Sequence, residues 1–140
     1  MNLQKAISIA IDAHHGQTDK SGTAYILHPL HVMSNMASED EMVVAVLHDV
    51  LEDTIITLEY LKENDLTDIQ SEALQLLTKH KGITYMNYIK RLSKNNIARN
   101  VKIEDLKHNL DITRLPEWYD SSYIIKKYTK ALNFLTSYQN

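Results

Sequence analysis

The sequence predicts an all-α fold, a compact bundle of seven or eight helices in a single domain that spans residues 1–140. Apolar side chains make up 44% of the chain and recur at the three- and four-residue spacing of helices. No strand-like alternation lasts more than a few residues. Three glycines and two prolines leave little sequence for turns, which favours long helices over a turn-rich β fold.

The chain opens with two helical patterns separated by a polar loop. The first helix is predicted over residues 3–14, where Ala and Ile recur at helical spacing. Two glycines among Ser, Thr and Asp predict a loop over residues 15–23. The second helix is predicted over residues 27–36, and Pro29 fits its first turn because no backbone N–H is needed there.

A third helix is predicted to begin at Ser38, because Ser38 and Glu41 form the capping-box pattern of a helix start. This helix carries the segment "MVVAVLHDVLED" and is expected to end near Asp53. Thr57 is the expected cap of a short fourth helix with the sequence "LEYLKEN".

Four further helical patterns follow in the second half of the chain. These helices are predicted over residues 68–78, 84–95, 97–113 and 121–139. Gly82 follows the first of them and Pro116 follows the third, as expected for helix ends. In the last helix, Tyr, Ile, Ala and Leu side chains form one stripe, which is typical of core packing.

Charge is distributed unevenly along a chain whose net charge is −3. Residues 1–78 carry three lysines against thirteen acids, whereas residues 79–107 carry eight Lys and Arg against two acids. Such a basic segment is either a solvated helix face or a wall that faces phosphate groups. Nucleic acid is not expected as a partner, because the whole chain is acidic and its aromatic residues are not interleaved with basic ones.

The composition also bears on the compartment and on the kind of metal site. The absence of cysteine excludes disulfides and thiolate ligands. No apolar run approaches the ~18 residues of a membrane span, and no charged-then-apolar leader opens the chain. We therefore expect a cytoplasmic protein with no role at a membrane, and self-association into a homo-oligomer is left open.

Four ionisable residues, His48, Asp49, Glu52 and Asp53, end an otherwise apolar segment. Burying charge is costly unless the charge is paired or binds a metal ion, and carboxylates at a helix C-terminus oppose the helix dipole. On one continuous helix His48 would lie over Glu52 and Asp49 over Asp53, since positions i and i+4 share a face. The set therefore predicts a metal site with two further carboxylates beside it.

Two ligands are too few for a stable site, so other ligands are expected from elsewhere in the chain. His28 lies in an apolar setting, and Asp105 and Asn109 are four residues apart among apolar neighbours. Two imidazoles and two carboxylates, from His28, His48, Asp49 and Asp105, suit manganese, iron or zinc better than magnesium or calcium. The structural alternative is that each histidine is a hydrogen-bonded core residue and that Asp49 pairs with a lysine.

Three segments of the chain resemble, in order and spacing, the hydrolase half of the RelA/SpoT proteins, which are HD-domain metal-dependent phosphohydrolases. The segments are "AHHGQTDKSGTAYILHPLHV", "VAVLHDVLEDTIIT" and "VKIEDLKHN", and the resemblance covers about residues 5–115. RelA/SpoT proteins make and destroy the guanosine tetraphosphate and pentaphosphate alarmones. Because the chain is too short for the synthetase half, the resemblance implies a stand-alone small alarmone hydrolase of the HD fold.

The resemblance also implies a role for particular positions. It implies one divalent ion, usually manganese, held by His28, His48, Asp49 and Asp105. It implies that Glu52 and Asp53 act on the attacking water, and it gives as substrate-binding residues Lys20, Ser21, Tyr25 and Asn109. His14, in the "AHxGQ" element, is interpreted as structural. The implied reaction is hydrolysis of (p)ppGpp at the 3′-pyrophosphate, which yields GDP or GTP and pyrophosphate.

Two positions depart from the family pattern. Alarmone hydrolases usually carry a basic residue that packs on the guanine base just before the "KSG" segment, and another at the second position after "HN". Here these positions are Asp19 and Asp111, so anions replace cations near a polyanionic ligand. Lys90 and Arg91, in the basic segment, are the expected neutralisers of the developing phosphate charge.

Three alternatives to alarmone hydrolysis stay open at this point. The first is the same chemistry on another nucleotide, such as a 5′-nucleotide or a nucleotide sugar, which Asp19 and Asp111 favour. The second is a module that binds a nucleotide without turnover, against which the intact Glu52 and Asp53 argue. The third is a scaffold that meets a partner protein through the tyrosine-rich last helix.

Overall fold

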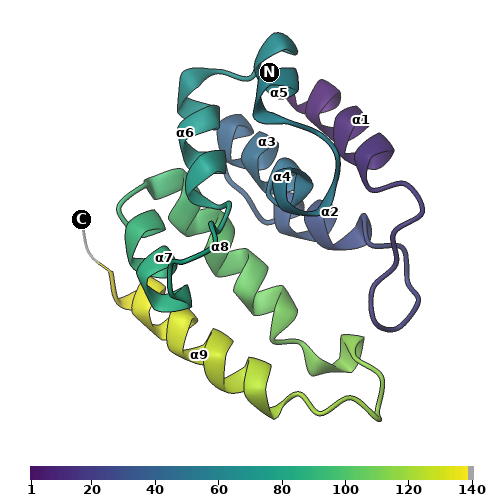
Figure 1. Ribbon diagram of the computed structural model, residues 1–140, viewed down its shortest axis with the longest axis vertical. Coiled ribbons are helices and arrows are strands. Elements are labelled where there is room, and N and C mark those ends of the chain that lie inside the picture. Colours follow the sequence, from purple (N-terminus) through teal and green to yellow (C-terminus); the bar gives the residue numbers. More distant parts are fainter. Residues whose placement is uncertain (139–140) are drawn as a thin grey trace.

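The computed structural model describes residues 1–138, in which helices follow one another along the chain and are joined by loops (Figure 1). They are α1 (Leu3–Ala13), α2 (Leu27–Ser34), α3 (Glu39–Leu47), α4 (Val50–Asp53), α5 (Leu58–Glu63), α6 (Asp68–Leu76), α7 (Tyr85–Leu92), α8 (Asn96–Asn109), the 3-10 turn η1 (Ile112–Arg114) and α9 (Ser122–Ser137). Within the described range, β pairing is limited to one isolated bridge between Thr18 and Ala24. The all-α prediction is confirmed, and each predicted helical segment is helical.

Side-chain caps set the start of two helices as the sequence predicts. At α3 the Ser38 hydroxyl accepts the N–H of Glu41 at 3.2 Å, and the Glu41 carboxylate accepts the N–H of Ser38 at 3.2 Å. At α5 the Thr57 hydroxyl accepts the N–H of Tyr60 at 3.1 Å. Each cap satisfies backbone donors that the helix itself leaves unpaired, which stabilises the helix by about 1 kcal/mol.

The third predicted helix is not continuous, and this part of the prediction is wrong. α3 ends at Leu47 and α4 begins at Val50, with a tight turn at His48 and Asp49 between them. The backbone N–H of His48 bonds to the carbonyl of Ala45, three residues back, at 3.3 Å. The His48 ring Nδ1 approaches the same carbonyl at 2.5 Å. The Ala45 carbonyl thus pairs with both the backbone N–H and the ring of His48, and the helix tightens at this point. The tighter turn changes the direction in which the His48 and Asp49 side chains point.

The predicted helix over 97–113 is shorter than expected and ends at Asn109. The carboxylate of Asp111 accepts the N–H of Thr113 at 3.1 Å, which starts the turn η1 instead of a further helical turn. Asp and Asn side chains compete in this way with the helical ladder. The last predicted helix, over 121–139, is α9 as far as Ser137, and residue 139 lies outside the described residues.

α3 is the central element, and it contacts α1, α2, α6 and α8 (Figure 1). Its residues 43–47 are completely buried, which explains why this segment is apolar at every position. α9 lies along α8 and buries Ala131 and Leu135, so the stripe on this helix packs into the core from there, while Tyr123 stays exposed. Among residues 1–138, no helix combines the length and apolar character needed to cross a membrane.

Leu74 on α6 tests how much this core contributes to stability. Its side chain is completely buried, whereas Ile69 on the same helix is 60% exposed. Leu74→Ala is expected to lower the free energy of unfolding by about 2–5 kcal/mol, because the change removes buried methyl groups and leaves a cavity. Ile69→Ala is the matched control and should stay within about 0.5 kcal/mol of the original chain in urea unfolding. Equal losses in the two variants would contradict the packing of α6 described above.

Candidate metal centre

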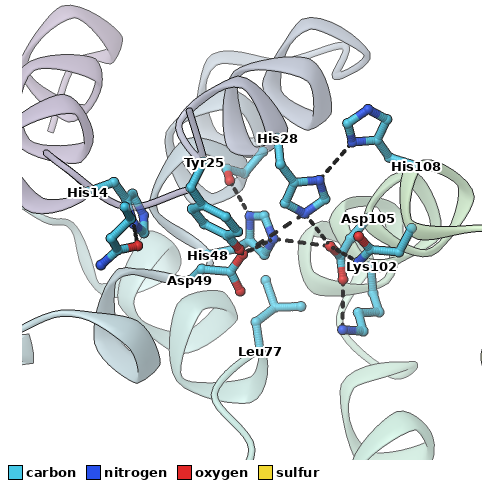
Figure 2. Close-up of polar contacts among 12 residues, drawn as sticks. His14, Tyr25, His28, His48, Asp49, Leu77, Lys102, Asp105 and His108 are labelled. Atoms are coloured by element: carbon cyan, nitrogen blue, oxygen red, sulfur yellow. Dashed lines mark hydrogen bonds and ion pairs between the residues drawn. The ribbon is translucent and has the colours of Figure 1, made fainter. Parts of the chain in front are cut away.

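Two imidazoles and two carboxylates converge where α2, α8 and the α3–α4 turn meet (Figure 2). α2 carries His28, α8 carries Asp105, and the turn carries His48 and Asp49. His28 and His48 are each 3% exposed and Asp105 is 4% exposed, while Asp49 is half-buried. The four residues that the sequence singles out as metal ligands therefore lie together, although they come from three separate parts of the chain.

The Nε2 atoms of both imidazoles face the carboxylate oxygens. His28 Nε2 lies 2.8 Å from Asp105 Oδ1 and 3.9 Å from Asp49 Oδ2. His48 Nε2 lies 3.0 Å from Asp49 Oδ2 and 3.3 Å from Asp105 Oδ1. One ligand atom each from His28, His48 and Asp49 lies within 4.8 Å of the others, a spacing at which a single cation can touch all three.

The hydrogen-bond chemistry of His48 tests whether this donor set fits a metal ion. Its Nδ1 lies 2.5 Å from the carbonyl of Ala45, and a carbonyl can only accept, so Nδ1 carries the ring hydrogen. A neutral His48 then directs the Nε2 lone pair at the oxygens of Asp49 and Asp105. In this arrangement the Nε2 lone pair faces the carboxylate oxygens, which are also acceptors. A cation between them would interact favourably with all of these atoms. The donor set therefore fits a divalent ion, with the second ring nitrogen held as metal-binding histidines usually hold theirs.

The two carboxylates also favour a proton on His48, which a metal ion would displace from Nε2. Burial opposes the charged form of His48, but Asp49 and Asp105 outweigh burial and hold the pKa of His48 well above its usual range. Burial would likewise raise the pKa of Asp49, yet the neighbouring His48 lowers it to about 2. The pKa of Asp105 is held well below its usual range, against burial, chiefly by Lys102 and then by His48. The cluster therefore presents ionised carboxylates and attracts positive charge.

Three neighbouring side chains hold the two carboxylates in place. Lys102 Nζ donates to Asp105 Oδ2 at 2.8 Å, and Asn109 Nδ2 donates to Asp105 Oδ1 at 3.1 Å. The Tyr25 hydroxyl donates to Asp49 Oδ2. Burial first, and then the charge of Asp49, raise the pKa of Tyr25 far above its usual value, so the hydroxyl keeps its proton.

Glu52 and Asp53 on α4 have different surroundings. Glu52 lines a cavity of about 280 Å³ together with Asp49 and Asp105, and its carboxylate accepts the N–H of Lys79. Both residues are exposed, but Asp53 does not line this cavity, and its backbone carbonyl accepts from Gln17 Nε2 at 2.9 Å. Burial raises the pKa of both carboxyl groups, with a further contribution from the charge of Asp49. Glu52 is thus the one of the two acids that shares a cavity with Asp49 and Asp105.

Three lysines, Lys79, Lys102 and Lys127, line this cavity, which we call the metal-side cavity. Lys90 and Arg91, the cations expected to serve here, are exposed on α7 and do not line it, so that prediction is corrected. The basic segment, residues 79–107, contributes Lys79 and Lys102 to the cavity instead, because the chain that follows α6 and one face of α8 lie beside it. Lys127 comes from α9, a helix from which the sequence suggested no site residue.

A second hollow of about 280 Å³, the loop-side cavity, adjoins the first. The two cavities share Tyr25, Asn109 and Tyr128. Lys20 lines the loop-side cavity, and its Nζ lies 4.6 Å from the centre of the Tyr119 ring. Three of the predicted substrate-binding residues, Lys20, Tyr25 and Asn109, therefore meet here. The fourth, Ser21, lies on the other side of the loop, where its hydroxyl donates to the carbonyl of Arg114 at 2.6 Å.

Asp19 and Asp111 both line the loop-side cavity, and both shape the local backbone. Asp19 Oδ1 accepts the N–H groups of Ser21 at 2.9 Å and Thr23 at 3.0 Å, which closes the loop between α1 and α2. Asp111 starts η1 in the same manner. Each aspartate thus has a structural reason for its place, in addition to the negative charge that it brings to the cavity.

Arg114 is a residue of this cavity that the sequence did not reveal. Its guanidinium donates to the carbonyl of His108 at 2.9 Å and to Asn109 Oδ1 at 3.4 Å. Burial first, and then the charge of Arg114, lower the pKa of His108 to about 4. Arg114 follows Asn109 by five residues, and only the turn η1 brings its side chain back to the site, so no periodic pattern could indicate it.

His14 lies apart from the ligand cluster. It is buried, its Nδ1 lies 2.9 Å from Gln17 Oε1, and its ring centre lies 5.1 Å from that of Tyr25. Gln17 in turn bonds to the backbone of α4. These contacts support the interpretation of His14 as a residue that supports the loop.

The sequence is similar to parts of much longer proteins, although no family model matches it. It is 32% identical over 99 residues to a guanosine-3′,5′-bis(diphosphate) 3′-pyrophosphohydrolase of Spiroplasma citri, and the match covers 68% of this chain and 12% of that protein. A protein of the same name from Haemophilus influenzae is 49% identical over 59 residues, which are 39% of this chain and 9% of the relative. The chain thus spans 12% or less of the length of these relatives.

The fold is also that of a solved structure. A metazoan ortholog of SpoT that hydrolyzes ppGpp superposes with a TM-score of 0.80, with 99% of this chain and 86% of that chain covered. The two sequences are 20% identical, so this likeness concerns the fold, while the relatives above provide the likeness in sequence. Taken with the His and Asp residues described here, these similarities show that the chain belongs to the RelA/SpoT type of HD hydrolase domain.

Proposed function

We propose that the chain is a metal-dependent phosphohydrolase that removes the 3′-pyrophosphate of (p)ppGpp, with GDP or GTP and pyrophosphate as products. The observation that supports this most strongly is the convergence of His28, His48, Asp49 and Asp105, with Glu52 lining the same cavity as Asp49 and Asp105. The names of its relatives add the substrate class. A cytoplasmic location and the absence of nucleic-acid binding stay predictions, and self-association into a homo-oligomer is left open.

In the proposed mechanism His28, His48, Asp49 and Asp105 hold one divalent ion. Two nitrogen and two oxygen ligands suit manganese, iron or zinc, and the resemblance to the alarmone hydrolases favours manganese. Bound there, the ion supplies Lewis acidity and neutralises charge on the phosphoryl group. Tyr25 and Asn109 keep Asp49 and Asp105 oriented through the hydrogen bonds described above.

Glu52 is the proposed general base. Its carboxylate lines the same cavity as Asp49 and Asp105, and its raised pKa brings it closer to the pH at which it must take a proton from the attacking water. Asp53 keeps an assisting role in the proposal, through the negative charge that it adds beside Glu52. Lys79 and Lys127 are the proposed partners of the pyrophosphate charge, since both line this cavity.

The two adjoining cavities suggest how the nucleotide lies. The metal-side cavity has lysines together with Asp49 and Asp105, which suit a metal-bound pyrophosphate. The loop-side cavity has Lys20 and Arg114, which suit a nucleoside that carries 5′-phosphates. The shared residues Tyr25 and Asn109 would then lie beside the ribose. This arrangement puts the scissile bond next to Glu52 and the base next to Asp19 and Asp111.

A substrate panel tests the proposal. The Mn²⁺-loaded protein is incubated with ppGpp, pppGpp, 5′-nucleotides and nucleotide sugars, and phosphate and pyrophosphate release are measured. Pyrophosphate release from ppGpp or pppGpp alone supports the alarmone as substrate. Asp19 and Asp111 in the loop-side cavity favour a second candidate, the same hydrolysis of another nucleotide, and that candidate is correct if ppGpp is inert while such a nucleotide is cleaved.

The charge of Asp19 provides a sharper prediction about the base. Asp19→Arg is expected to lower KM for ppGpp by roughly 2- to 30-fold, because a guanidinium stacked on a purine contributes ~0.5–2 kcal/mol that a carboxylate cannot. Asp19→Asn is the matched control, since its amide oxygen still accepts from Ser21 and Thr23 while the charge is gone. It should lower KM by less. An unchanged KM in both variants would count against a base at this position.

A further inference from the structure

Three histidine rings in contact form a row that runs from the metal centre to the surface. The rings of His28 and His108 are parallel within 3°, with centres 5.0 Å apart, and the rings of His31 and His108 are stacked at 3.9 Å. His28 is buried, His108 is half-buried and His31 is exposed. His31 and His108 have no part in the proposed mechanism, and neither was indicated by the sequence.

The contact between the first two rings is a hydrogen bond. His28 Nδ1 and His108 Nδ1 lie 2.7 Å apart (Figure 2). Only one hydrogen fits between two ring nitrogens at this distance, so one ring donates and the other accepts. The distance alone does not show which ring is the donor. The surroundings of the second ring nitrogen of His28, Nε2, identify it.

His28 Nε2 points into the ligand cluster, 2.8 Å from Asp105 Oδ1. To give the Nε2 lone pair to a metal ion, a neutral His28 must carry its ring hydrogen on Nδ1. His108 Nδ1 is then the acceptor, and the ring hydrogen of His108 lies on Nε2. Any other placement of the hydrogens on the neutral rings leaves either His28 unable to bind the ion or two N–H groups facing each other at 2.7 Å.

We infer that His108 is a positioning residue, which fixes the tautomer of His28 and aims its Nε2 at the metal ion, with His31 holding the ring of His108 by stacking. The inference rests on the proposed metal centre. In His48 the hydrogen is held on Nδ1 by the carbonyl of Ala45. The two proposed metal-binding imidazoles thus have their tautomers fixed by different acceptors. A neutral imidazole as the acceptor adds no further negative charge beside Asp49 and Asp105.

The backbone around His108 supports this role. Arg114 donates to the His108 carbonyl at 2.9 Å, which ties the end of α8 to the turn η1. His31 lies one helical turn beyond His28 on α2, so that one face of this helix presents both the metal ligand and the ring that covers His108. The position of the acceptor is thus determined from two sides, by α2 and by η1.

The experiment compares His108→Phe and His108→Gln in the full chain by Mn²⁺ titration, with free Mn²⁺ followed by electron paramagnetic resonance. Phe keeps a flat ring under His31 but cannot accept a hydrogen bond, so the affinity for Mn²⁺ should fall about 10- to 100-fold. Gln offers a carbonyl oxygen as acceptor and should restore most of this loss. His15→Phe, at an exposed histidine outside the cluster, is the control and should leave the affinity unchanged.

Unchanged affinity in His108→Phe, or an equal loss in the Phe and Gln variants, overturns the inference. Thermal unfolding in the presence of a chelator shows whether each variant folds without metal. If His108→Phe does not fold, ¹⁵N NMR of the Zn²⁺-loaded original chain gives the answer, because a proton on His28 Nδ1 supports the inference and a proton on His28 Nε2 overturns it. Failure of the original chain to bind Mn²⁺ would instead remove the metal centre, and the inference with it.

Discussion

The double variant His48→Ala, Asp49→Ala is expected to bind no divalent metal ion and to have no hydrolase activity. Its two deleted groups come from the same turn, and their Nε2 and Oδ2 atoms lie 3.0 Å apart at the centre of the cluster. Only His28 and Asp105 would remain, and two ligands do not hold an ion in competition with water. The metal content of the purified protein after loading with Mn²⁺ measures the effect, and the original chain should contain one ion per chain.

A matched double variant separates this effect from general damage. Asp12 and His15 are an exposed acid and an exposed histidine near the end of α1, and replacing both with alanine should leave metal content at one ion per chain. Circular dichroism of both double variants shows whether the helices are retained. Equal metal occupancy in His48→Ala, Asp49→Ala and in the original chain would mean that the ligand set is wrong.

The second large effect is expected from Glu52→Gln, which should keep the fold and the metal ion but lower turnover by roughly 10²–10⁴-fold, the usual contribution of a general base. Glutamine still has an oxygen that can accept the N–H of Lys79, so the change removes the proton acceptor with little effect on local structure. Asp53→Asn should have a smaller effect, because Asp53 does not line the metal-side cavity.

The pH dependence of turnover offers an independent check on the same residue. A general base works only when it is deprotonated, so turnover should fall as the pH is lowered through the pKa of Glu52. Because burial raises this pKa, the fall should occur at a higher pH than an ordinary glutamate would give. Glu52→Gln should lose this step while metal binding is unchanged.

Glu59→Gln, at an exposed acid on α5, is the control for both measurements and should behave as the original chain. Unchanged turnover in both Glu52→Gln and Asp53→Asn would remove these residues from the mechanism. It would favour a module that binds a nucleotide without hydrolysing it, since the metal ligands would still be intact.

The helices and the candidate ligands of this protein could be predicted from its sequence by itself, because the sequence patterns that indicate them are local. Helical periodicity and caps such as Ser38 and Thr57 depend on neighbours within a few residues, so the order of the helices could be predicted before any packing was known. The residue types at His28, His48, Asp49 and Asp105 were likewise visible, as polar groups in apolar surroundings and as a resemblance to a known family.

The tertiary structure decided what depends on contacts between distant segments. The break between α3 and α4 arises because the Ala45 carbonyl serves both the backbone and the ring of His48, and helical periodicity contains no information about such a competition. Lys127 and Arg114 reach the cavities only because α9 packs along α8 and η1 turns the chain back. The pairing of His28 with His108 spans eighty residues and required the packing of α2 against α8, since imidazoles become hydrogen-bond partners only where helix packing brings their rings together.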